Sequence, residues 1–198
     1  MYEVLNSKYT YKNTNVLKNK LGIKNEKELK NADTNIVTKK LQEIKLEKFK
    51  RTYDEKHFKF IHKFLFEELY EFAGKYREEN ILKENFRFSQ FEYIDENIKK
   101  ILKKIDLEKL KSEDFEKQIE DVSEIMTDLN VLHPFREGNG RAIREFIREL
   151  LEDMGYEINF FNIEYEEIIE ASKYAVFDET KQKNLLKKYI KSKKELNK

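Results

Sequence analysis

The stretch HPFREGNGR occupies residues 133–141 and concentrates the residues that break helices. The chain has one proline and five glycines, and this stretch contains the proline and two of the glycines. Proline disfavours the α region for the residue before it, so Pro134 predicts that a helix ends at His133. Apolar residues at helical spacing precede and follow the stretch, which predicts a corner between two helices.

The two helices that meet at this corner follow from their apolar spacing. Upstream, the apolar positions run from Phe115 to Leu129, and Ser112 is the expected N-cap because acidic residues fill the turn after it. Downstream, they are Ala142, Ile143, Phe146, Ile147, Leu150, Leu151 and Met154. Other segments with helical spacing cover residues 34–49, 57–72, 93–105, 165–174 and 180–192. The predicted class is therefore all-α.

One segment, residues 75–90, departs from helical spacing and alternates weakly around Ile81, Phe86 and Phe88. This alternation predicts a loop with a short β-hairpin. No repeat or linker interrupts the chain, so we expect a single domain over residues 1–198. Its core should span about 34–175, its hairpin about 76–90 and its C-terminal helix about 179–195.

Composition excludes several classes of protein. Lys and Arg number 40 and Asp and Glu 39, so the net charge is only +1 and a dedicated nucleic-acid binder is disfavoured. Cysteine is absent, which excludes disulfides and thiolate metal sites and fits a reducing compartment. No run of about 18 apolar residues and no secretory signal is found, so we expect a cytoplasmic protein without a membrane partner. Delivery into another cell by a signal-less route stays open.

The polar residues after Pro134 suit a phosphate site. Glycines let the backbone approach a ligand, and the first amides of a helix bind anions because they have no internal partner. Arg141 and Arg144 lie three positions apart and should share the helix face beside these amides. Glu137 suits Mg²⁺, which takes one or two protein carboxylates plus phosphate oxygens.

His133 lies at the other rim of the stretch and is the side chain best placed to take a proton near neutral pH. Phosphoryl or nucleotidyl transfer is the reaction class that uses all these groups. The alternative is a helix–loop–helix corner with a buried histidine. A zinc-protease site is excluded, because the proline and glycine around Glu137 forbid a continuous helix. We expect His57 and His62 to be packing or surface residues.

The segment HPFREGNGRAIR at 133–144 matches the Fic-domain signature HPFx[D/E]GNGRxxR at every fixed position. The segments YTYKNTNVLKNKLGI at 9–23 and YEFAGKYREENILKENFRF at 70–88 resemble the opening and the flap of bacterial Fic toxins. The resemblance to the Fic family implies a helical bundle with a β-hairpin flap. It also implies AMPylation, the transfer of AMP from ATP to a protein hydroxyl with release of pyrophosphate.

The resemblance also assigns roles to residues. His133 would deprotonate the target hydroxyl, Phe135 would anchor the loop, and Glu137 would hold Mg²⁺ on the α- and β-phosphates. The residues that would bind the phosphates are Gly138, Asn139, Gly140 and Arg141, with Arg144 at the γ-phosphate. The flap residues that would pair with the target as an added strand are Ile81, Leu82, Lys83 and Glu84.

Many Fic proteins carry an inhibitory helix with the pattern [S/T]xxxE[G/N], whose Glu pairs with the residue that matches Arg144. Only Ser112 and Glu116 have this spacing here, and Lys117 follows where Gly or Asn belongs. In SKKELN, Glu195 lies one position too early. The resemblance therefore implies a class I toxin with a separate small antitoxin. It also implies a type II topoisomerase subunit as the target protein of the toxin. Phosphotransfer, phosphocholine transfer and a non-catalytic nucleotide-binding module are the alternatives.

Overall fold

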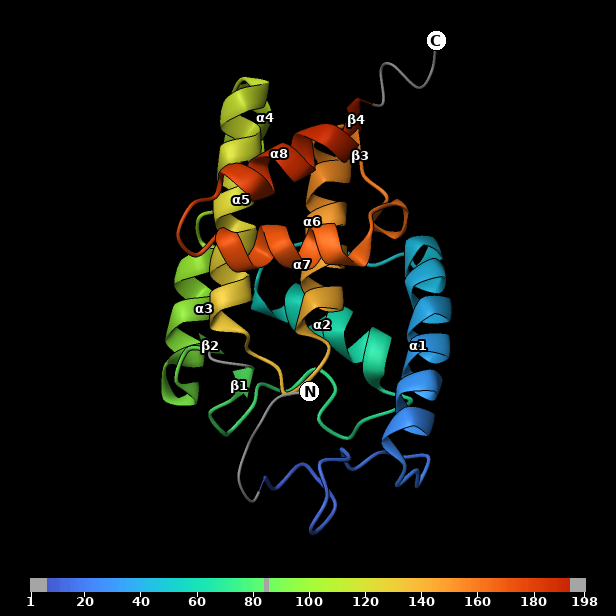
Figure 1. Cartoon of the computed structure of the whole chain (residues 1–198). Coiled ribbons are helices and arrows are strands. Elements are labelled where there is room, and N and C mark those ends of the chain that lie inside the picture. The colour runs from blue at the N-terminus through green and yellow to red at the C-terminus, as the bar shows by residue number, and fades with distance from the viewer. Residues whose placement is uncertain (1–6, 84–85, 193–198) are drawn as a thin grey trace.

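The computed structural model describes residues 7–83 and 86–192 and shows a bundle of helices with two very short sheets (Figure 1). The α-helices are α1 (Glu26–Glu43), α2 (Glu55–Phe66), α3 (Ile94–Leu102), α4 (Leu107–Ser112), α5 (Phe115–Leu132), α6 (Asn139–Asp153), α7 (Tyr165–Tyr174) and α8 (Thr180–Tyr189). The strands are β1 (Leu82–Lys83), β2 (Phe86–Arg87), β3 (Tyr156–Glu157) and β4 (Lys191–Ser192), and the 3-10 turns are η1 (Ile44–Leu46), η2 (Phe91–Tyr93) and η3 (Phe160–Asn162). The all-α prediction is confirmed.

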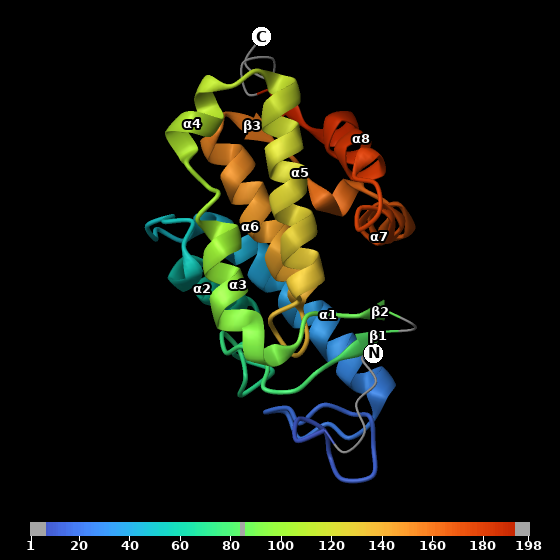
Figure 2. The ribbon, with the colours of Figure 1, turned by 90° about the vertical axis from the view of Figure 1, so that its left-hand side faces the viewer.

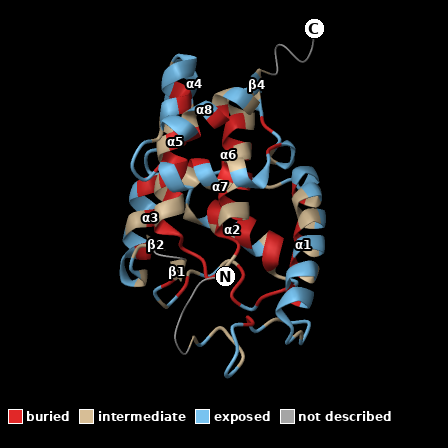
Figure 3. Ribbon diagram, viewed as in Figure 1, coloured by how far each residue is buried: buried red, intermediate tan, exposed pale blue. Residues whose placement is uncertain are grey.

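The helices α5 and α6 form the centre of the bundle. They pack against each other, α2 packs on α6, α3 packs on α5, and α8 covers α5 and α7. Figures 1 and 2 show that the α5–α6 corner and the β1–β2 hairpin lie at the same end of the bundle. Buried residues concentrate on α2, α5 and α6 (Figure 3). The site is therefore built on the most deeply packed helices.

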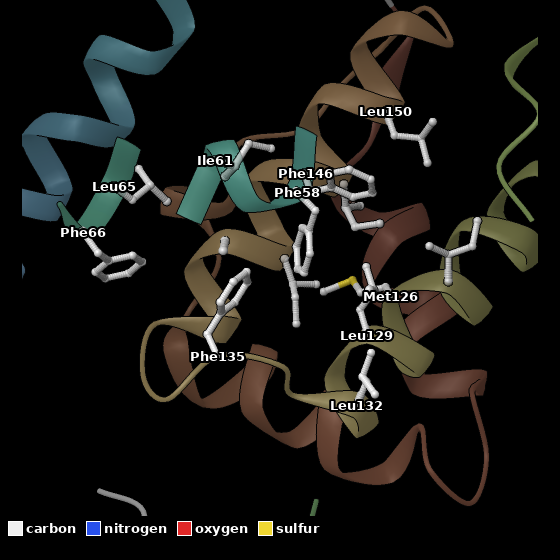
Figure 4. Close-up of a cluster of buried hydrophobic side chains, with 14 of the residues drawn as sticks. Phe58, Ile61, Leu65, Phe66, Met126, Leu129, Leu132, Phe135, Phe146 and Leu150 are labelled. Carbon is white, nitrogen blue, oxygen red and sulfur yellow. The ribbon is translucent and has the colours of Figure 1, made fainter. Parts of the chain in front are cut away.

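Aromatic side chains link the central helices (Figure 4). Phe58 of α2 lies between Phe135 of the corner, with ring centroids 5.3 Å apart, and Phe146 of α6, at 5.2 Å. All three side chains are completely buried. Each such side chain stabilises the fold by about 1.5–3 kcal/mol relative to exposure. Phe135 thus anchors the corner in the core, as the sequence suggested.

Several predicted boundaries are wrong. Ser112 is the last residue of α4, and Asp114 caps α5 by accepting a bond from the Lys117 amide. Both Ser and Asp are good caps, and Asp114 directly precedes the helix. The apolar spacing did not predict α4, whose N-cap Asp106 accepts a bond from the Lys109 amide.

Other helices differ from their predicted lengths. The segment predicted at 34–49 begins at Glu26, where Asn25 caps it, and the helix predicted at 57–72 ends at Phe66. The C-terminal helix ends at Tyr189 rather than about residue 195, because Lys191–Ser192 pair as a strand with Tyr156–Glu157. Among the helices of the described ranges, none is long and apolar enough to cross a membrane.

Candidate active site

The corner between α5 and α6 begins with an unusual backbone conformation. His133 follows α5 in the left-handed region (φ 48°, ψ 61°), and its amide still donates to the Leu129 carbonyl. Few residues other than glycine adopt this region. Pro134 disfavours the α conformation before it. The predicted helix end at His133 is confirmed, and the imidazole is turned out of the line of α5.

Asn139 braces the loop from inside. Its side chain accepts a bond from the Phe135 amide and donates one to the Phe135 carbonyl, both at 2.8 Å. The residue is completely buried. The side chain of Asn139 therefore stabilises the loop. The predicted contact of Asn139 with phosphate would be made by its backbone amide.

His62 supports the same loop, and it packs as predicted. Its ring stacks on Phe135 with centroids 3.7 Å apart. Nδ1 accepts from the Gly74 amide at 2.9 Å, so Nε2 carries the proton that bonds the Glu137 carbonyl at 2.9 Å. Burial lowers the pKa of His62 to about 3, so the ring is neutral.

Glycine is sterically required at position 138, and the space around Gly140 is tight. A Cβ on Gly138, which has φ 82°, would lie 2.3 Å from Cζ of Phe66. A Cβ on Gly140 would lie 3.1 Å from Nη1 of Arg144. Gly138 is also the N-cap of α6, whereas α1, α2 and α5 begin with an Asn or Asp side chain that accepts from the first turn. The N-terminus of α6 thus keeps the geometry of an anion site.

The imidazole of His133 is buried but correctly oriented for a base. Nδ1 donates to the Asn130 carbonyl at 2.8 Å, which places the lone pair on Nε2. The Phe88 ring stacks on it at 3.9 Å between centroids. Burial, with Arg77 and Lys83 nearby, lowers the pKa of His133 to about 3. The histidine is therefore neutral at physiological pH, with a pKa well below the near-neutral value that the sequence suggested.

The two arginines of the motif have different surroundings. Arg141 bonds both carboxylate oxygens of Asp33 in α1 and lies over the Phe66 ring, 4.7 Å from its centroid. Arg144 makes no hydrogen bond or ion pair within residues 7–83 and 86–192. Burial and the charge of Arg141 lower the pKa of Arg144 to about 10. Arg144 is a half-buried cation that an anionic ligand would stabilise.

Glu137 stands alone as a candidate metal ligand. Its Oε1 accepts from the Gly138 amide at 2.9 Å and lies 3.8 Å from Nη2 of Arg141. The described residues contain no group of three or more His, Cys, Asp or Glu side chains that could hold a metal. One carboxylate fits Mg²⁺ where phosphate oxygens complete the coordination.

The hairpin agrees with the predicted flap only in part. Leu82 pairs with Arg87 and Lys83 with Phe86. Ile81 precedes the strand and is 2% exposed, so its side chain is buried rather than presented on the surface. Leu82 and Lys83 are half-buried, and Glu84 lies outside the described residues. The flap is thus available mainly through the backbone of Leu82 and Lys83.

Sequence reasoning missed three residues that surround the site. Asp33 holds Arg141, Phe88 covers His133, and Arg77 bonds the corner's carbonyl oxygens. Arg77 and Phe88 lie in the segment 70–88 that resembles the flap, but neither that resemblance nor the corner motif assigns them, or Asp33, a role at the site. Hydrophobic spacing could not indicate Arg77 and Asp33, whose burial depends on partners elsewhere in the fold.

A model of the Fic/DOC family matches residues 52–151 of the chain. The chain is similar to the protein adenylyltransferase VbhT of Bartonella schoenbuchensis, with 36% identity over 172 residues that cover 86% of this chain and 36% of that protein. It is also similar to the probable protein adenylyltransferase Fic of Salmonella typhimurium, with 31% identity over 159 residues, 80% of this chain and 78% of that one. The chain thus spans about a third of the first relative and most of the second.

Solved structures of related domains have the same fold. The BepC protein of Bartonella tribocorum with bound AMPPNP superposes with a TM-score of 0.86 at 25% identity, covering 93% of this chain and 96% of that one. An N-terminal Fic domain from Bartonella quintana with bound ADP gives 0.86 at 27% identity, covering 95% and 96%. Sequence match, fold and the geometry of the α5–α6 corner agree, and the chain belongs to the Fic/DOC family.

Proposed function

We propose that this chain is a protein adenylyltransferase that moves AMP from ATP to a hydroxyl side chain of a target protein. The observation that carries the proposal is one corner that combines the neutral imidazole of His133, the glycine-capped N-terminus of α6 and the cation of Arg144, which has no ion pair within the described ranges. The names of the relatives and the nucleotides bound in the related structures support the same activity.

The proposed reaction uses His133 as general base. Nε2 takes the proton of the target hydroxyl, whose oxygen attacks the α-phosphorus of ATP. The bond from the α-phosphorus to the bridging oxygen breaks, and pyrophosphate leaves. Arg144 and the first amides of α6 stabilise the negative charge on the departing phosphates. Mg²⁺ held by Glu137 and phosphate oxygens would neutralise part of this charge.

The nucleotide site does not use its two arginines equally. Asp33 already neutralises Arg141, so Arg144 is the guanidinium that gains most from a phosphate. We therefore assign the main electrostatic contact to Arg144, while Arg141 shares its donors between Asp33 and the nucleotide.

The hairpin is the proposed docking strand for the target. A target backbone would extend the β1–β2 sheet by strand addition, which needs main-chain donors and acceptors rather than side chains. Lys83→Pro should therefore reduce target modification several-fold more than ATP affinity, because proline removes a ladder donor. Equal losses in the two assays would place residues 82–83 in the nucleotide site instead.

The proposed partners are a target protein and a small antitoxin. The 198 residues contain no complete [S/T]xxxE[G/N] pattern, and this supports an inhibitory Glu supplied by a separate protein. Expression of the chain alone should then arrest growth, and co-expression of a small protein that carries the pattern should relieve the arrest. A subunit of a type II topoisomerase is the first target to test.

Intact-mass measurement tests the central proposal. The chain is incubated with ATP, Mg²⁺ and the topoisomerase subunit or, in parallel, with fractionated bacterial proteins. A gain of one AMP on an acceptor protein, lost with excess chelator, is the expected result. A gain of one phosphate would establish phosphotransfer instead, and no gain on any protein would count against both enzymatic functions.

A further inference from the structure

Arg77 is a buried arginine that the proposed reaction does not use. Its side chain is 2% exposed, although an arginine is rarely buried without partners. The guanidinium donates to the carbonyl oxygens of His133 (2.8 Å), Glu79 (2.8 Å), Leu132 (3.2 Å) and Ser89. Its backbone amide donates to the Pro134 carbonyl at 2.8 Å. One residue thus joins the end of α5 to both sides of the hairpin.

The chemistry of these bonds requires an arginine. The last carbonyls of a helix have no internal partners, and Leu132 and His133 supply two of them at the end of α5. A cation there is also favoured by the helix dipole. Arginine carries five donors in a rigid fork, whereas lysine has three donors on one atom. Lysine at position 77 could keep the charge but could not bond carbonyls on opposite sides.

The contacts of Arg77 also position Phe88, whose ring covers the imidazole of His133. Ser89, which accepts from Arg77, follows Phe88, whose ring stacks on His133 at 3.9 Å. The Ser89 amide donates to the Val131 carbonyl at 3.2 Å, so this side of the hairpin is attached to α5.

A second ion pair attaches the other side of the hairpin segment. Nε of Arg136, inside the motif, lies 2.7 Å from Oε1 of Glu79, and Arg136 is 1% exposed. Glu79 is therefore bound through its carboxylate by Arg136 and through its carbonyl by Arg77. The hairpin and the base form one mechanically connected unit.

We propose that Arg77 is a positioning residue for the transfer reaction, which holds the imidazole of His133 and the docking strand of the hairpin in a fixed relation. The proposal rests on the proposed adenylyltransferase function. A shift of about 1 Å between base and target hydroxyl can cost about a hundredfold in rate. Loss of Arg77 should thus slow transfer more than it weakens nucleotide binding.

The test compares Arg77→Lys with Arg148→Lys, a half-buried arginine in the C-terminal half of α6 that pairs with Glu145 and makes no contact with the hairpin among the described residues. Both variants keep the charge, so neither removes the electrostatic effect of a cation. NMR of ¹³C-labelled histidine follows the three histidines separately. In Arg77→Lys we expect His133 to lose the ring-current shift from Phe88, and its pKa to rise by about one unit or more as water enters. Arg148→Lys should leave both values unchanged. Wild-type values in a folded Arg77→Lys would overturn the proposal.

Activity gives a second readout. With ATP labelled on the α-phosphate, Arg77→Lys should transfer AMP about a hundredfold more slowly, while its affinity for AMPPNP stays near that of the wild type. Equal losses of rate and affinity would contradict a positioning role. If even the wild type transfers no AMP, the proposed function fails, and the histidine spectra still decide whether Arg77 places His133.

A measurement on the wild-type protein tests the same proposal even where the Arg77→Lys variant does not fold. The Nε proton of Arg77 is buried and bonded to the His133 carbonyl, whereas Arg87 is exposed. We expect the Arg77 proton to exchange with solvent far more slowly than that of Arg87. Equally fast exchange would show that the connection is absent in solution and would overturn the proposal.

Discussion

Charged side chains lie along both halves of α6, and the two halves differ in how completely these charges are paired. In the C-terminal half, Glu145 pairs with Arg148 at 2.7 Å, Glu149 bonds the imidazole of His57 at 2.8 Å, and Arg51 pairs with Glu152 at 2.8 Å and Asp153 at 2.7 Å. Near the N-terminus, Arg144 has no carboxylate among the described residues, and His133 is neutral. The pairs of the C-terminal half attach α6 to α2, whereas Arg144 in the N-terminal half could pair with an anionic ligand.

Two buried histidines beside α6 also differ in the hydrogen bonds that they make, and this difference shows which of them can act in the reaction. His57 and His133 are both buried histidines, but Nδ1 of His57 accepts from the Tyr53 amide, so its Nε2 proton goes to Glu149. His133 has the opposite tautomer, with its proton on Nδ1 and its lone pair on Nε2. Only the second arrangement can accept a proton from a substrate through Nε2.

The largest expected effect is the loss of the base. His133→Ala should reduce AMP transfer by about 10²- to 10⁴-fold, the usual cost of removing a general base. Affinity for AMPPNP should stay near the wild-type value, because the imidazole does not bind the phosphates. The measurement is transfer rate against nucleotide affinity for both proteins. Near-normal turnover by the variant would remove His133 from the reaction and make the two ends of α6 alike.

Arginine replacements at the two ends should have opposite consequences. Arg148→Ala removes the arginine that pairs with the buried carboxylate of Glu145, which should lower the free energy of unfolding by about 3 kcal/mol or more. Arg144→Ala removes a cation that has no ion pair in the described part of the chain, so stability should be unchanged or higher. Its affinity for AMPPNP should fall about tenfold or more, the value of a hydrogen bond to a charged group. Denaturant unfolding and nucleotide titration of both variants check this, and a large stability loss in Arg144→Ala would contradict the comparison.

The pH dependence of the free energy of unfolding should reveal the low pKa values of His62 and His133, which lie near the α5–α6 corner. Burial lowers the pKa of His62 and of His133 to about 3, whereas an unfolded imidazole has a pKa of about 6.5. Between these values the unfolded chain binds protons that the folded chain does not. The contribution is complete above pH 6.5 and falls by about 1.4 kcal/mol per pH unit per histidine as the pH drops toward 3.

Denaturant unfolding at several pH values between 7.5 and 5 measures this slope. His133→Ala should have a slope smaller by about one proton, and Arg144→Ala, which removes no histidine, should keep the wild-type slope. An unchanged slope in His133→Ala would show that its imidazole titrates normally in the folded protein.

The sequence could predict the central helices and their corner because these depend on local signals. The apolar spacing of α5 and α6 and the effect of Pro134 act within a few residues. Helix and strand ends that depend on neighbouring elements could not be predicted from these local signals. The strand Lys191–Ser192 forms because β3 lies beside it, and the choice of Asp114 over Ser112 as cap followed from the formation of α4.

The motif identified most residues of the candidate site, but it predicted the contacts of only some of them. Phe135 anchors the corner as predicted, but the side chain of Asn139 braces the loop and the side chain of Ile81 is buried, and the motif indicated neither of these. The split between Arg141 and Arg144 depends on Asp33, which lies 108 positions before Arg141. Spacing within the motif contains no information about such a partner.

The smallest expected effect tests whether pairing alone separates the two motif arginines. Asp33→Asn removes the charge that neutralises Arg141 but keeps an oxygen that can accept from Arg141 and from the Tyr70 hydroxyl, now 3.1 Å from Asp33. With one negative charge fewer beside the phosphates, affinity for AMPPNP should rise about two- to fivefold, the range of a partly exposed ion pair. Tyr70→Phe is the matched control, because it removes the hydroxyl bond and leaves the Asp33 charge in place. If Asp33→Asn instead weakens nucleotide binding while Tyr70→Phe does not, Asp33 orients Arg141 toward the phosphates. Arg141 would then resemble the fixed ion pairs at the far end of α6 rather than the available cation of Arg144.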